Sequence, residues 1–130
     1  MLRVVVPNHS TLLFSATLAI LFLFGFGQSA FSHAILLEAA PAVDSTVNGP
    51  DLSVRLRFNV RIDLNRSRLA LVFPDGKSAT LVIKQEESPD SLSAQVKGLA
   101  HGGAYRLRWQ VLASDGHITR GEIPFRVTNP

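Results

Sequence analysis

Cysteine is absent from the sequence, and the single methionine is the first residue. The chain can therefore form neither a disulfide framework nor a metal site built on thiolates. Any metal site must use imidazole, carboxylate, backbone or terminal amine groups. A glycine-rich loop of the kind that cradles phosphate groups is also lacking.

Clustered positive charge is missing as well. After residue 32, twelve Lys and Arg stand against ten Asp and Glu, a slight excess. Arg55, Arg57, Arg106 and Arg108 alternate with apolar residues, which is typical of a solvated strand face and not of a nucleic-acid patch. We expect no nucleic-acid partner.

One long apolar run is present, and it lies close to the start of the chain. Arg3 precedes the uncharged segment TLLFSATLAILFLFGFG at residues 11–27, and small residues occupy positions 30 and 32. This order predicts a secretory signal peptide over residues 1–32, cleaved before His33. The alternative is a retained membrane anchor, because the run approaches the roughly 18 to 20 residues that a spanning helix needs.

The remaining chain, residues 33–130, alternates between apolar and polar residues with a period of two. In LSVRLRFNV, residues 52–60, every second side chain is apolar, which predicts a half-buried strand. The turn sequence Pro74-Asp75-Gly76-Lys77 predicts a hairpin. Residues 84–91 are polar enough to form an exposed loop, which could include a short edge strand. Further strands are expected at residues 34–39, 67–73, 79–84, 91–96, 104–112 and 123–127.

Six to seven short strands without a helical period describe an all-β domain, either an antiparallel β-sandwich or a barrel. We expect the sandwich, because the aromatic side chains of Phe58, Trp109 and Phe125 each fall on the apolar face of a strand. Two facing sheets would share them in one core.

Cleavage before His33 would create an unusual group. An N-terminal histidine can offer its α-amine and its ring Nδ1 to one ion, and Cu(II) favours such nitrogen-rich sites. Because the amine has an ordinary pKa near 8 and binds only when deprotonated, metal affinity should fall with pH. The alternative is that the cut simply happens to precede a histidine.

The segment Ser114-Asp115-Gly116-His117 supplies the remaining candidates. Along an extended strand Asp115 and His117 would project to the same side, so they could complete a site begun by His33. Asp115 would then bind the metal or orient the ring. The alternative is an ordinary type I′ turn with an exposed histidine.

Two other arrangements of these polar residues are disfavoured. His101 lies in a glycine-rich turn and is expected to face solvent. A hydrolytic triad of Ser114, Asp115 and His117 would hold its members too close in sequence to align nucleophile, base and acid.

Together these residues resemble the CopC family of periplasmic copper-binding proteins. The resemblance covers HAILLEAAPAVDSTV from residue 33, VRLRF from residue 54 and GGAYRLRWQVLASDGHITRGEIPFRV from residue 102. It is most specific in a set of eight positions: Tyr105, Trp109, Ser114, Asp115, Gly116, His117, Gly121 and Phe125.

The resemblance implies a seven-stranded Greek-key β-sandwich or barrel and a periplasmic role in copper homeostasis or resistance. It implies one Cu(II) ion held by His33 with its amine, by Asp115 and by His117. It also implies a non-enzymatic monomer whose partner is an inner-membrane copper importer of the CopD type.

The sequence departs from the family pattern in two places. Some members bind Cu(I) through a methionine-rich segment, whereas residues 33–130 contain no methionine, so we expect copper binding to be limited to Cu(II). Members often have an acidic residue shortly after the second-strand Phe; here Phe58 is followed by Asn59-Val60-Arg61, and Asp63 lies further along.

Two functions of other classes are also compatible with the sequence. The domain could be an immunoglobulin-like envelope interaction module without a functional metal site, which a retained membrane anchor would favour because His33 would then have no α-amine. It could also be a copper-dependent oxidative enzyme with an N-terminal histidine, although so small a domain offers little surface for a substrate.

Overall fold

The computed structural model describes Leu2 and residues 33–130. The signal peptide predicted over residues 1–32 therefore lies, apart from Leu2, outside the described residues. No helix in the described part of the chain is long and apolar enough to cross a membrane.

Residues 33–130 form nine strands and no helix. The long strands are β3 (Leu52–Phe58), β4 (Ile62–Val72), β7 (Ser91–Val96), β8 (Gly103–Ala113) and β9 (Ile118–Thr128). The short ones are β1 (Leu36–Ala40), β2 (Thr46–Asn48), β5 (Ser78–Thr80) and β6 (Lys84–Gln85).

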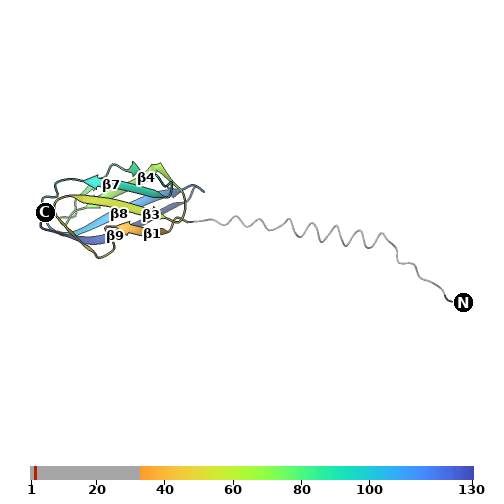
Figure 1. The fold of residues 1–130 in the computed structure, drawn as a ribbon, viewed down its shortest axis with the longest axis horizontal. Helices are drawn as coiled ribbons and strands as arrows, with labels where there is room; N and C mark the ends of the chain where they lie inside the picture. Colours follow the sequence, from red (N-terminus) through yellow and green to blue (C-terminus); the bar gives the residue numbers. More distant parts are fainter. Residues whose placement is uncertain (1, 3–32) are drawn as a thin grey trace. The chain divides into compact units, whose positions relative to one another are not determined.

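The strands form two sheets, as Figure 1 shows. One sheet has the order β1-β3-β7-β6, and the other has the order β2-β9-β8-β4-β5. The predicted all-β sandwich is therefore confirmed. The strand count exceeds the expected seven because short edge segments pair as well, and β2 lies parallel to β9.

The predicted hairpin is present, with β5 pairing antiparallel to β4 across the turn at residues 73–77. Its second strand is shorter than expected: residues 79–84 were predicted as a strand, but the pairing with β4 ends at Thr80. The polar segment at residues 84–91 forms the short edge strand β6 and then a loop that ends where β7 begins at Ser91.

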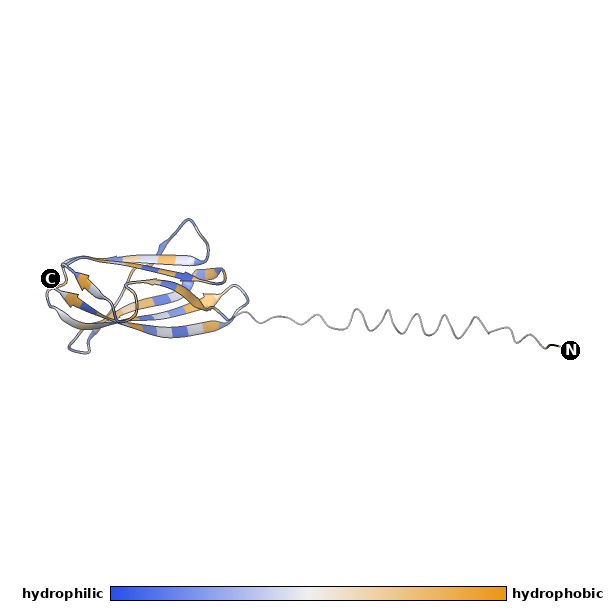
Figure 2. Cartoon of the chain, turned by 60° about the horizontal axis from the view of Figure 1, so that its bottom comes forward, coloured by the Kyte–Doolittle hydropathy of each residue, from blue (hydrophilic) through white to orange (hydrophobic). Residues whose placement is uncertain are grey.

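The core lies between the two sheets and follows the predicted alternation. Buried and exposed positions alternate along β3, and bands of opposite hydropathy follow one another along the strands in Figure 2. Phe58, Trp109 and Phe125 are all buried, at 0%, 6% and 2% exposure. Burying an apolar side chain of this size contributes about 1.5–3 kcal/mol to folding.

Trp109 packs between the two sheets from within the β8–β9 pair. Its ring meets Phe58 edge to face, with centroids 5.2 Å apart. It also lies over Gly121, its partner across the strands, where an added Cβ would sit only 2.4 Å from the ring atom Cζ2. The glycine therefore provides the space that lets the indole ring lie flat against β9.

Candidate metal centre

The segment at residues 114–117 is the turn between β8 and β9, not an extended strand. The N–H of Ala113 donates to the carbonyl of His117 (2.8 Å), and the N–H of Gly116 donates to the carbonyl of Ala113 (2.9 Å). The extended placement of Asp115 and His117 is therefore wrong. The segment is a turn, as in the alternative interpretation, but the turn is not of type I′ and His117 is only partly exposed. Only Gly116 among these residues has a positive φ, at 91°, whereas a type I′ turn needs two.

The turn nevertheless brings the carboxylate of Asp115 to the ring of His117. Its Oδ1 accepts a hydrogen bond from the backbone N–H of His117 at 3.0 Å and lies 3.2 Å from His117 Nδ1. The backbone N–H of His117 is the main cause that lowers the pKa of Asp115, and the rings of His117 and His33 act in the same direction. The carboxylate is thus an anionic oxygen donor at neutral pH.

His33 lies against this turn although it is distant in sequence. Its ring stacks on that of His117, with centroids 5.4 Å apart and planes inclined by 18°. The fold therefore brings all three predicted metal ligands to one end of the sandwich. His33 is exposed, and the His117 side chain retains 39% of its exposure.

These side chains are close, but they do not converge on one point. Within the described part of the chain, no group of three or more His, Cys, Asp or Glu residues forms a ready metal site. The stacking explains this, since an imidazole nitrogen binds metal in the plane of its ring and two nearly parallel rings face each other with their π surfaces.

The two residues that follow His33 are held in place by packing and by hydrogen bonds. Ala34 is 2% exposed and belongs to the core. The next residue, Ile35, is paired with Asn59 by two hydrogen bonds: its N–H donates to Asn59 Oδ1 at 2.6 Å, and its carbonyl accepts the N–H of Asn59 at 3.0 Å.

Asn59 was expected only as a departure from the family pattern, and its contacts with Ile35 could not be read from the sequence. The single signal was its position directly after the buried end of β3. Asp63, the nearest following carboxylate, is used within β4, where its Oδ1 accepts the backbone N–H groups of Asn65 and Arg66. His101 is exposed, as predicted.

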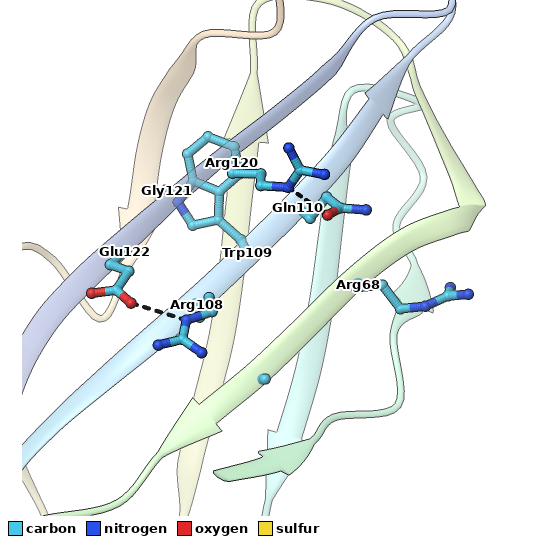
Figure 3. A pocket seen from close by; sticks show the side chains of 8 residues that line it. Arg68, Arg108, Trp109, Gln110, Arg120, Gly121 and Glu122 are labelled. Atoms are coloured by element: carbon cyan, nitrogen blue, oxygen red, sulfur yellow. Dashed lines mark hydrogen bonds and ion pairs between the residues drawn. The ribbon is translucent and has the colours of Figure 1, made fainter. Parts of the chain in front are cut away.

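A separate hollow of about 410 Å³ lies on the five-stranded sheet and is lined by none of the three predicted metal ligands. Figure 3 shows the side chains around it. Arg108 Nε donates to Glu122 at 2.9 Å and Arg120 Nε donates to Gln110 at 2.7 Å. These cross-strand pairs fix the arginine stems along the sheet.

The sequence and the fold both match known copper proteins. The family model of the CopC domain matches residues 36–128. Copper resistance protein C of Xanthomonas campestris pv. juglandis is 28% identical over 107 residues, covering 76% of this chain and 83% of that protein. The copper transport protein CutJ of Bacillus subtilis is 23% identical over 111 residues, which are 83% of this chain but only 20% of CutJ.

A solved structure agrees with these relatives. The crystal structure of CopC from Methylosinus trichosporium OB3b superposes with a TM-score of 0.64 and 28% identity, covering 75% of this chain and 95% of that one. With the family model spanning most of residues 33–130, the chain belongs to the CopC domain family, and its function is copper-related.

Proposed function

We propose that the protein, cleaved before His33, binds one Cu(II) ion at the end of the sandwich where His33, Asp115 and His117 lie together. The donors are the α-amine and ring of His33, the ring of His117 and the carboxylate of Asp115. The stacking of His33 on His117, two residues far apart in sequence, is the observation that supports this site.

The donor set suits Cu(II) chemically. Three nitrogen donors and one carboxylate oxygen match the tetragonal coordination that Cu(II) prefers, and copper has the highest affinity among the first-row divalent ions. The anionic Asp115 offsets part of the ion's charge. Because His33 is exposed, its side chain can change rotamer without moving the core.

The proposed role is non-enzymatic and periplasmic. The protein would buffer copper, or deliver it as a monomer to an inner-membrane importer of the CopD type. An ion held at the exposed end of the sandwich could be reached by a partner's ligands without unfolding. Relatives named for copper resistance and copper transport support this role.

Titration of the cleaved protein with Cu(II) tests the site directly. We expect tight binding of one ion per chain, and a protein with one extra residue before His33 should bind much more weakly, because its amine has become an amide. Equal affinity of the two proteins would exclude the N-terminal chelate. Absence of tight one-to-one binding by the cleaved protein would exclude the copper site itself.

The alternative function is that of an immunoglobulin-like envelope interaction module in which His33, Asp115 and His117 do not bind metal. This alternative fits a retained N-terminal segment, since His33 would then lack an α-amine. The intact mass of the protein recovered from cells distinguishes the two.

A further inference from the structure

Asn59 directly follows β3 and is hydrogen-bonded to Ile35, in the segment that includes His33. It directly follows Phe58, which is 0% exposed and ends β3. Phe58 is itself held by its packing on Trp109 and by its N–H, which donates to the carbonyl of Asp90 at 2.9 Å. The backbone at Asn59 therefore follows directly from a residue that is held in place by packing and by a hydrogen bond.

Asn59 forms two hydrogen bonds with the backbone of Ile35. The side-chain oxygen accepts the Ile35 N–H at 2.6 Å, and the Asn59 N–H donates to the Ile35 carbonyl at 3.0 Å. The first bond belongs to the side chain and can be removed by substitution, whereas the second belongs to the backbone and persists. Asn59 itself is exposed, so its side chain contributes little to the core.

These two hydrogen bonds restrain the backbone close to His33. Only Ala34 separates Ile35 from His33, and Ala34 is buried. When the backbone of Ile35 is held by hydrogen bonds, His33 has few conformations available and stays near the ring of His117. Without those bonds the backbone before Ile35 gains conformational entropy, which metal binding must then remove.

We propose that Asn59 is a positioning residue, whose side-chain oxygen preorganises His33 beside His117 for metal binding. This inference rests on the proposed function of His33 as a Cu(II) ligand. Asn59 does not touch the ion; it acts through the backbone of Ile35. Groups that hydrogen-bond a metal ligand directly change metal affinity by about 10- to 100-fold. Because Asn59 acts two residues away from His33, we expect the lower end of that range.

The test compares Asn59→Ala and Asn59→Asp in the cleaved protein with His33 at its N-terminus. Asn59→Ala should lower Cu(II) affinity about tenfold, measured by competition with a chelator. Asn59→Asp keeps an acceptor oxygen for the Ile35 N–H and should bind Cu(II) about as tightly as the wild type. Asn48→Ala is the matched control, because Asn48 Oδ1 accepts a hydrogen bond from Asn129 at 3.2 Å and pairs with the last residue of β9, far from His117.

Metal-free protein provides a second readout. The amide of Ile35 should exchange its hydrogen faster in Asn59→Ala than in the wild type, because its acceptor is gone, while amides of β3 keep their protection. In a His33→Ala background, Asn59→Ala should lose most of its effect on Cu(II) affinity, because the residue it positions is missing.

Unchanged affinity of Asn59→Ala, beside a wild type that binds Cu(II), would overturn the positioning role alone. An equal loss in the His33→Ala background would also overturn it, since the effect would not pass through His33. A wild type without Cu(II) affinity would overturn the proposed function and this inference together.

Discussion

Asp115 combines two tasks in one side chain. Its Oδ1 closes the turn by accepting the N–H of His117, and the same carboxylate faces the ring of His117 and carries negative charge. An amide in its place would keep the acceptor oxygen and lose the charge. The two tasks can therefore be separated by substitution.

We predict that Asp115→Asn keeps the turn but lowers Cu(II) affinity by about 10- to 100-fold, because the anionic oxygen donor is lost. Asp115→Ala should lower it further, since the turn loses its side-chain acceptor as well. Affinities are measured by chelator competition, and the turn is followed by amide exchange at His117. Equal affinities of Asp115→Asn and the wild type would show that the carboxylate does not serve the ion.

Gly121 is the second residue whose identity the structure explains. We predict that Gly121→Ala destabilises the fold by about 1–3 kcal/mol through overpacking, because the new Cβ would lie 2.4 Å from Trp109 Cζ2. Chemical denaturation measures this cost. In a Trp109→Leu background the same substitution should cost clearly less, and an equal cost would show that the indole ring is not what Gly121 accommodates.

At the scale of elements, the strands could be predicted and the contacts between distant elements could not. Alternation located β3, β8 and the second half of β9, because one face of each strand is buried and the other is solvated. The parallel pairing of β2 with β9 depends on a neighbour supplied by the fold, and no local pattern could predict it.

The same division holds for the candidate site. Local sequence left an extended segment and a turn at residues 114–117 equally plausible, and the register of β8 with β9 decided for the turn. The stacking of His33 on His117 and the hydrogen bond from Ile35 to Asn59 are contacts between segments far apart in sequence. Only the packed sandwich determines which of these polar residues meet.

Asp51 couples the start of β3 to the end of β7 and gives the fold a pH dependence. It bonds Lys97 Nζ at 2.8 Å and the N–H of Gly98 at 3.2 Å, and its pKa is lowered, first by Lys97 and then by Gly98. A lowered pKa stabilises the folded state above the ordinary value of about 3.9. That contribution is lost as the pH falls through the folded-state pKa.

We therefore predict that Asp51→Asn is slightly less stable than the wild type at pH 7, and that the difference shrinks as the pH falls below about 4. The effect should be small because both side chains are exposed and screened by solvent. Denaturation midpoints at several pH values measure it. A difference that stays constant down to pH 2 would mean that ionisation of Asp51 does not matter.

For the whole domain, the site lies at the end of a scaffold that is already packed. The core residues Phe58 and Trp109 are buried by contacts within the sandwich. The candidate ligands lie outside that core, in the turn at residues 114–117 and at His33 before β1. Metal binding should therefore add stability to a folded domain and should not be needed for folding. This separates it from small domains whose fold depends on their metal.

We predict that the cleaved protein folds without metal and that Cu(II) at 100 times its dissociation constant stabilises it by about 2.7 kcal/mol. For a domain of this size, that corresponds to a rise in Tm of about 10–20 °C. Calorimetric scans with and without Cu(II), followed by chelator, measure the rise and its reversal. The protein extended by one residue before His33 should show little of it, because the α-amine is blocked. An equal rise in both proteins would show that the α-amine of His33 does not bind the stabilising ion.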